Sequence, residues 1–122
     1  MRPLLVAVAV AVAITGGGVG NAAGSPAAAG KLVGTVGPGY SITLTAGGKK
    51  VTTLKAGTYT LTIHDEAAVH AWALDGPNGY AKDFTTVPFT GTKTFTVVLK
   101  KGAYKFYCAP HEGSMFGNFS VS

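Results

Sequence analysis

Hydrophobic and polar residues alternate in short runs through most of the chain after residue 30. Runs rich in Thr, Val, Phe and Tyr are separated by Gly and Pro turn signals, and none carries the periodicity of an amphipathic helix. The pattern predicts strands at residues 32–36, 40–45, 51–54, 58–64, 70–74, 93–99, 103–108 and 117–121. Seven or eight strands at this spacing predict an all-β domain, a β-sandwich with Greek-key connections.

The period of two also assigns each side chain to a face of its strand. Cys108 shares a face with Phe106 and is therefore expected to point inward. His64 falls on the polar face of its strand and is expected to face solvent, whereas His70 shares its face with Trp72 and can face the core. The predicted core includes Tyr59, Leu61, Ile63, Phe95, Val97 and Phe106.

The N-terminal segment has the features of an export signal. Arg2 precedes an unbroken apolar run from Leu4 to Ile14, which is shorter than the roughly 20 residues of a membrane span but fits a signal peptide. We predict a signal peptide and small-residue linker at residues 1–29 and one domain at residues 30–122. The protein is expected in the bacterial periplasm, at the cell surface or outside the cell, without stable membrane insertion; a retained anchor is the weaker alternative.

The charge of the chain is modestly positive. Without Arg2, nine Lys stand against five acidic residues, a formal net charge of +4. The lysines are spread along the chain with no basic helix, so nucleic acid is not an expected partner. Such a charge serves solubility or attracts an acidic partner protein. We expect the domain to be a monomer.

Metal-binding side chains gather near the C-terminus. Cys108 is the only cysteine, so it cannot form an intramolecular disulfide in an exported chain. His111 follows three residues later and Met115 four residues after that. A thiolate, two imidazoles and a weak axial thioether form the set that holds copper for electron transfer, and His70 is the candidate for the second imidazole.

Other interpretations of these residues are less favoured by their spacing. A lone cysteine can be a small core residue, but the spacing to His111 and Met115, with Pro110 between, favours a metal loop. Zinc also binds Cys and His, although a thioether is a poor fourth ligand for it. A catalytic Cys-His pair would need an exposed thiol and a third orienting residue, for which the sequence offers no candidate.

The same residues resemble a known family. Tyr107-Cys108-Ala109-Pro110-His111 and Met115-Phe116-Gly117-Asn118-Phe119-Ser120-Val121 are similar to the ligand loop and last strand of the cupredoxins, the blue copper proteins. Upstream segments resemble a bacterial exported plastocyanin-like group, so the likeness spans residues 31–122. It implies a Greek-key sandwich with one type 1 copper held by His70, Cys108, His111 and Met115. Ala71 departs from the family, which usually has Asn there to tie two copper loops together.

The function predicted from this resemblance is one-electron transfer by a small exported carrier, not an enzyme. A redox partner protein is expected to dock transiently near His111. The alternative is a copper-binding module for trafficking or sequestration without a dedicated redox partner. Such modules often use clusters of Met and His, whereas Met115 is the only methionine besides the initiator.

Overall fold

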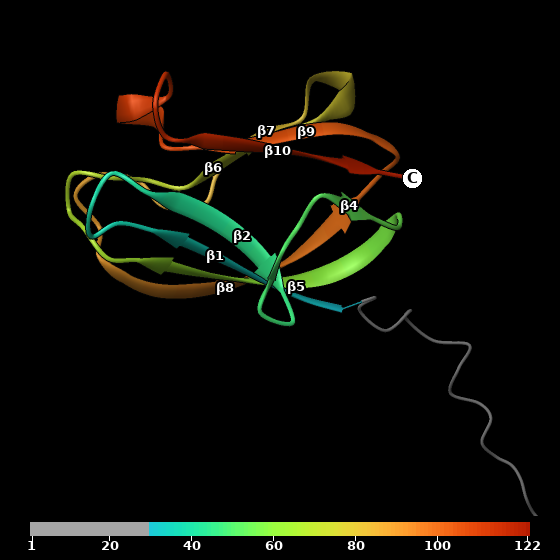
Figure 1. Ribbon diagram of the computed structural model, residues 1–122, viewed down its shortest axis with the longest axis horizontal. Helices are drawn as coiled ribbons and strands as arrows, with labels where there is room; N and C mark the ends of the chain where they lie inside the picture. The colour runs from blue at the N-terminus through green and yellow to red at the C-terminus, as the bar shows by residue number, and fades with distance from the viewer. Residues whose placement is uncertain (1–29) are drawn as a thin grey trace, which may run out of the picture.

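The computed structural model describes residues 30–122 (Figure 1), so the predicted signal peptide and linker at residues 1–29 lie outside the described residues. The described residues form ten strands and two one-turn 3-10 helices, η2 (Pro77–Gly79) and η3 (Ala109–His111). The strands are β1 (Gly30–Val36), β2 (Ile42–Ala46), β3 (Lys49–Lys50), β4 (Thr53–Leu54), β5 (Gly57–Asp65), β6 (Ala73–Asp75), β7 (Ala81–Asp83), β8 (Gly91–Leu99), β9 (Gly102–Tyr107) and β10 (Phe116–Val121).

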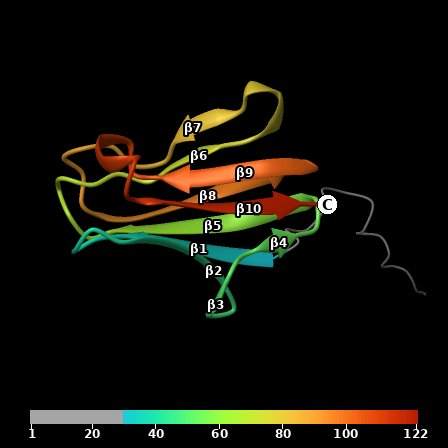
Figure 2. The ribbon, with the colours of Figure 1, turned by 45° about the horizontal axis from the view of Figure 1, so that its top comes forward.

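The strands form two five-stranded sheets that face each other (Figures 1 and 2). One sheet has the order β3-β2-β1-β5-β8 and the other the order β4-β10-β9-β6-β7. Strand β1 pairs in parallel with β5 and antiparallel with β2, so the chain repeatedly crosses between the sheets instead of forming a simple meander. The prediction of an all-β sandwich is confirmed.

Two strands were missed by the sequence pattern, and one was placed too early. Strands β3 and β7 are only two and three residues long and fully exposed, so neither has a buried face to produce alternation. The prediction that His70 begins a strand is wrong, because β6 starts at Ala73 and His70 lies in the preceding loop. Every residue from 70 to 74 is buried or nearly so, and a run buried on both sides carries no period of two.

Aromatic rings fill the space between the sheets. Trp72 is fully buried, and its ring stacks on that of Phe106 with centroids 5.6 Å apart and planes 3° from parallel. Its indole Nε1–H donates a hydrogen bond to the carbonyl of Thr43 in the opposite sheet, at 3.2 Å. All the predicted core residues are buried except Phe95, which is only partly so. Because Trp72 contacts both sheets, the loop that leads into it is fixed in place.

The two ends of the sandwich differ. Strands β1, β5 and β9 finish at one end, which also carries η3, and we call it the ligand-loop end. Strands β8 and β10 finish at the opposite end, where the label C stands in Figure 1. No helix among residues 30–122 has the length and apolar character needed to cross a membrane.

A glycine in β1 makes room for the tryptophan. A Cβ atom at Gly34 would lie 2.7 Å from Ile63 Cδ1 and 2.8 Å from Trp72 Cε2. Gly34→Ala should therefore lower the free energy of unfolding by about 1–3 kcal/mol through overpacking. Gly39→Ala, where an added Cβ meets nothing within 4 Å, is the matched control and should change it by less than about 0.5 kcal/mol. Urea denaturation measures both, and equal stability of the two variants would contradict the packing described.

Candidate metal centre

Two loops at the ligand-loop end carry the four predicted ligands. His70 lies between β5 and β6, whereas Cys108, His111 and Met115 lie between β9 and β10. Cys108, His70 and Met115 are buried, with at most 1% of each residue exposed, and His111 is partly exposed. The inward direction predicted for Cys108 and His70 is confirmed. The inward direction of the His70 side chain comes from its loop, because this residue is not in a strand.

Three donor atoms converge on one point. His70 Nδ1 and His111 Nδ1 lie 3.2 Å apart, and Cys108 Sγ lies 3.7 Å and 3.6 Å from them, respectively. A point equidistant from the three atoms lies about 2.0 Å from each, close to the bond lengths that imidazole and thiolate donors form with a first-row metal ion such as zinc. One sulfur and two imidazole donors suit copper. The residues therefore fit a copper ion bound between them.

The loop that supplies Cys108 and His111 is braced by its own backbone. The N–H groups of Cys108 and Met115 donate to the carbonyls of Met115 and His111, at 3.0 and 2.8 Å, and that of His111 donates to Cys108 at 2.9 Å. Pro110 is the second residue of η3, within the first turn, where its missing N–H costs no hydrogen bond. Phe116 then pairs with Tyr107, so β9 and β10 close the loop at both ends. This short, closed loop fixes the positions of sulfur and imidazole.

The loop of His70 is joined to the sulfur through a backbone amide. The Ala71 N–H donates to Cys108 Sγ at 3.4 Å, and this dipole stabilises negative charge on the sulfur. Next to it, the Trp72 N–H donates to Thr85 Oγ1 at 2.9 Å, and the Phe84 N–H donates to the Trp72 carbonyl, also at 2.9 Å. Thr85 is buried. Backbone contacts and the Thr85 hydroxyl therefore fix this loop, in which the Ala71 side chain can make no hydrogen bond.

Tyr40 also belongs to the site, although no sequence motif marks it as a site residue. Its ring meets those of His70 and His111 edge to face, with centroids 5.1 and 4.9 Å apart, yet 71% of the residue is exposed. The tight turn before it includes Gly37 at φ 78°, a conformation that favours glycine. The sequence pattern placed Tyr40 at the start of the strand predicted at residues 40–45, whereas β2 begins at Ile42. An aromatic residue beside a turn does not specify which rings it contacts.

Tyr107, directly before Cys108, is held as a neutral phenol. Its hydroxyl donates a hydrogen bond to Asp75 Oδ1 at 3.0 Å. Burial, then this hydrogen bond, then the negative charges of Asp75, Glu112 and Asp83 raise the pKa of Tyr107 to about 12. Glu112, within the ligand loop, forms an ion pair with Lys105 Nζ at 2.9 Å. Tyr107 therefore adds no charge beside the sulfur through the physiological range.

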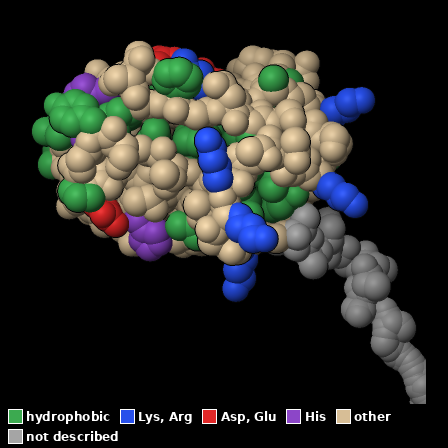
Figure 3. Space-filling view, in the orientation of Figure 1, with side chains coloured by type: hydrophobic (Ala, Val, Ile, Leu, Met, Phe, Trp, Pro, Cys, Tyr) green, Lys and Arg blue, Asp and Glu red, His purple; other side chains and the backbone are tan. Residues whose placement is uncertain are grey.

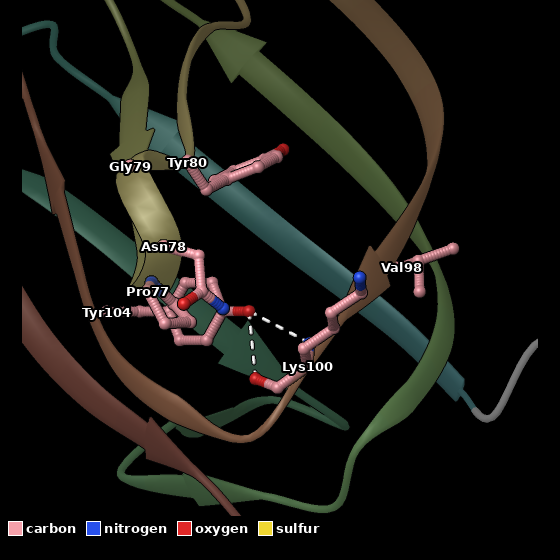
Figure 4. Close-up of a pocket in the computed structure, with 7 residues that line it drawn as sticks. All are labelled: Pro77, Asn78, Gly79, Tyr80, Val98, Lys100 and Tyr104. Carbon is pink, nitrogen blue, oxygen red and sulfur yellow. Dashed lines mark hydrogen bonds between the residues drawn. The ribbon is translucent and has the colours of Figure 1, made fainter.

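Neither His64 nor a cavity at the other end of the sandwich belongs to this site. His64 is partly exposed on β5, and its Nδ1 lies 3.1 Å from Thr92 Oγ1, apart from the cluster of His70, Cys108 and His111. A cavity of about 240 Å³ lies at the opposite end of the sandwich, against η2, Tyr80 and Tyr104 (Figure 4). The residues that line this cavity include no His, Cys or Met. The candidate functional site is therefore the donor cluster of His70, Cys108 and His111.

The fold and the donor set define a copper-binding β-sandwich, and comparisons agree. A family model for copper binding proteins of the plastocyanin/azurin family matches residues 41–122. The chain belongs to this family, the cupredoxins, and copper is its cofactor.

Solved structures show the same fold. A copper protein, rusticyanin, matches with 20% identity and a TM-score of 0.53 over 75% of this chain and 76% of its own. Rusticyanin from Thiobacillus ferrooxidans matches with 22% identity and a TM-score of 0.52 over the same shares, 75% and 76%. Auracyanin B matches with 16% identity and a TM-score of 0.51 over 80% and 92%. No curated protein sequence gives a significant match.

Removing the Thr85 hydroxyl should loosen the loop of His70. Thr85→Val leaves the buried Trp72 N–H without its acceptor, and the free energy of unfolding should fall by about 1–3 kcal/mol. Thr85→Ser keeps the hydroxyl and should retain most of the stability. Thermal unfolding of the three proteins measures the effect, and a Thr85→Val protein as stable as Thr85→Ser would refute the role of this hydrogen bond.

Proposed function

We propose that this protein is a one-electron carrier whose single type 1 copper is held by His70, Cys108, His111 and Met115. The observation that carries the proposal is the convergence of one sulfur and two imidazole nitrogens, all within 4.8 Å of one another, at one end of a β-sandwich. Met115 is buried, and its backbone is hydrogen-bonded to both Cys108 and His111, so its thioether would be the weak fourth donor to the metal. Bound copper supplies a couple between Cu(I) and Cu(II).

The contribution of the protein is to fix the positions of the sulfur and imidazole donor atoms. A carrier is fast only when its ligands hardly move between the two oxidation states, and both loops are fixed by backbone hydrogen bonds. The thiol of Cys108 binds as the thiolate, and its proton leaves on metal binding. His70 and His111 bind as neutral imidazoles through Nδ1, so that the proton of each ring stays on Nε2.

Burial favours a carrier over the other functions. Cys108 and His70 are closed off from solvent, and only His111 reaches the surface. Substrate chemistry requires an open coordination position, and cargo exchange is faster where the donors are exposed. Electron transfer requires neither, because an electron passes through the edge of the imidazole. A copper-binding module for trafficking or sequestration is therefore the second candidate function.

The docking surface that we propose for a redox partner surrounds His111. Ala109 and Pro110 are exposed beside it, Phe116 is 47% exposed and Tyr40 is 71% exposed. This exposure shows that the Phe116 ring is not part of the core. A small apolar patch suits a brief encounter that forms and dissociates quickly. Export, as predicted from residues 1–29, would place the carrier outside the cytoplasm.

Replacing the sulfur tests the proposed site. Cys108→Ser should abolish the intense visible absorption of the Cu(II) protein, since a hydroxyl oxygen cannot replace the thiolate–copper bond, while the sandwich stays folded. His70→Ala should reduce bound copper well below one ion per chain, and His64→Ala is its matched control and should leave stoichiometry and spectrum unchanged. An unchanged visible band in the Cys108→Ser protein would overturn the assignment.

A charge in the apolar patch should slow electron exchange. In self-exchange two copies meet patch to patch, so Phe116→Glu places like charges together and should lower the rate about tenfold or more. Val98→Glu, at a position 60% exposed on β8, is the control and should have little effect. NMR line broadening of mixed oxidation states measures the rate. An unaltered rate in the Phe116→Glu protein would move the docking surface away from His111.

A further inference from the structure

The inward face of β5 ends in a carboxylate at the ligand-loop end. Every second residue from Tyr59 to Asp65 is buried, and Asp65 is the last of these, with 2% of the residue exposed. Its register partners are Val36 in β1 and Gly91 in β8, so its two direct neighbours in the sheet offer no polar side chain. Burial of a carboxylate is unfavourable unless other groups compensate for the lost water. Asp65 therefore needs a compensating group within the fold.

One oxygen of this carboxylate builds the turn that carries His70. The Ala67 N–H donates to Asp65 Oδ1 at 3.3 Å, as in a turn closed by an aspartate side chain. The Ala67 carbonyl in turn accepts a hydrogen bond from the His70 N–H at 3.1 Å. Gly37 lies against the same turn, since a Cβ atom there would lie 3.0 Å from Ala67 Cβ and 3.4 Å from His70 Cδ2. Two successive hydrogen bonds therefore connect Asp65 to the first of the proposed ligands.

The second oxygen of Asp65 and the second ring nitrogen of His70 share one property. Among the buried side-chain nitrogen and oxygen atoms of residues 30–122, only Asp65 Oδ2 and His70 Nε2 have no hydrogen-bond partner. The two are chemically complementary, because a carboxylate accepts and the imidazole carries its proton on Nε2 when Nδ1 binds a metal. A carboxylate is a common outer partner of a metal-bound histidine. The metal centre is therefore the candidate for the group that compensates Asp65.

The surface of the domain supplies no comparable charge. The one ion pair within residues 30–122 joins Lys105 and Glu112, so no cationic side chain neutralises Asp65. The face of the molecule in Figure 3 shows more lysine than acidic side chains, and exposed charges are screened by water and salt over about 10 Å. The carboxylate of Asp65 is closed off from solvent. Its charge therefore acts on the metal centre more strongly than an equal charge on the surface.

The charge of the proposed centre changes on electron transfer. The Cys108 thiolate cancels one of the two charges of Cu(II) and the single charge of Cu(I), while His70 and His111 bind as neutral imidazoles. The oxidised centre is therefore positive and the reduced centre neutral. A fixed negative charge close by stabilises the positive state and leaves the neutral state unaffected. A buried carboxylate beside the centre should therefore lower its reduction potential.

We propose that Asp65 is a positioning and tuning residue of the metal centre. Its Oδ1 atom fixes the turn that carries His70, and its buried negative charge favours the oxidised state. Asp65 is not a member of the donor cluster, so it acts through His70 and through its charge. The proposal rests on the ligand set proposed above, and it adds the residue that sets how readily the reduced protein gives up its electron.

A substitution that removes the charge and keeps the turn tests the tuning role. The amide oxygen in Asp65→Asn can still accept from the Ala67 N–H, but the negative charge is lost. In a redox titration of the copper-loaded protein, the equilibrium between Cu(II) and Cu(I) should shift about tenfold toward Cu(I), the lower end of what one nearby charge does to a protonation equilibrium. For a one-electron couple this is a rise in the reduction potential of about 59 mV.

Glu66→Gln is the matched control. It removes the same charge from the next residue, whose side chain is exposed, and should shift the equilibrium less than about threefold because water and salt screen it. Equal shifts in the two variants would show that net charge is responsible and would overturn tuning by Asp65.

The same titration separates this proposal from the proposed function. A potential that Asp65→Asn leaves unchanged would overturn the tuning role, while the intense visible absorption of the Cu(II) protein would still support the copper carrier. A native protein without that absorption would overturn the proposed function, and the tuning role with it.

Amide hydrogen exchange, measured by NMR on the diamagnetic Cu(I) protein, tests the positioning role. Asp65→Ala removes the acceptor of the Ala67 N–H, so exchange of this amide should become about fivefold faster, the effect expected for one lost hydrogen bond. Asp65→Asn keeps the acceptor and should exchange within about twofold of the native rate. Native protection of the Ala67 amide in the Asp65→Ala protein would overturn the positioning role.

Discussion

Cys108 Sγ and the Nδ1 atoms of His70 and His111 come from two loops that are far apart in the sequence and are drawn within 4 Å of one another. Bringing two polar imidazoles and a thiol out of water is unfavourable unless the groups have partners. A bound copper ion provides that partner for all three lone pairs at once. The rest of the structure keeps these three atoms at that spacing.

The core and the loops share this task. Trp72, two residues after His70, is stacked on Phe106, two residues before Cys108, so this contact between neighbouring segments of one sheet sets the distance between the two ligand loops. The Ala71 N–H then joins one loop to the sulfur of the other. Packing in the core of the sandwich therefore also fixes the donor atoms at its end. Because these atoms are fixed, the ligands move little when an electron is transferred.

Sequence reasoning recovered what periodicity and side-chain chemistry encode. Alternation predicted most strands and the inward direction of Cys108, and the spacing of Cys108, His111 and Met115 predicted a metal loop. It failed where alternation is absent: in the short exposed strands β3 and β7, and around His70, where five successive buried residues have no polar face. Tyr40 and Thr85 could not be found, because their roles depend on contacts between segments distant in the chain.

X-ray absorption at the copper edge tests the central claim, that the protein holds one donor set fixed in both oxidation states. The account predicts two nitrogens and one short sulfur at about 2.0–2.3 Å from copper. These distances should change by less than about 0.2 Å between Cu(I) and Cu(II). A copper shell of nitrogen and oxygen without sulfur, or a larger rearrangement on reduction, would contradict it.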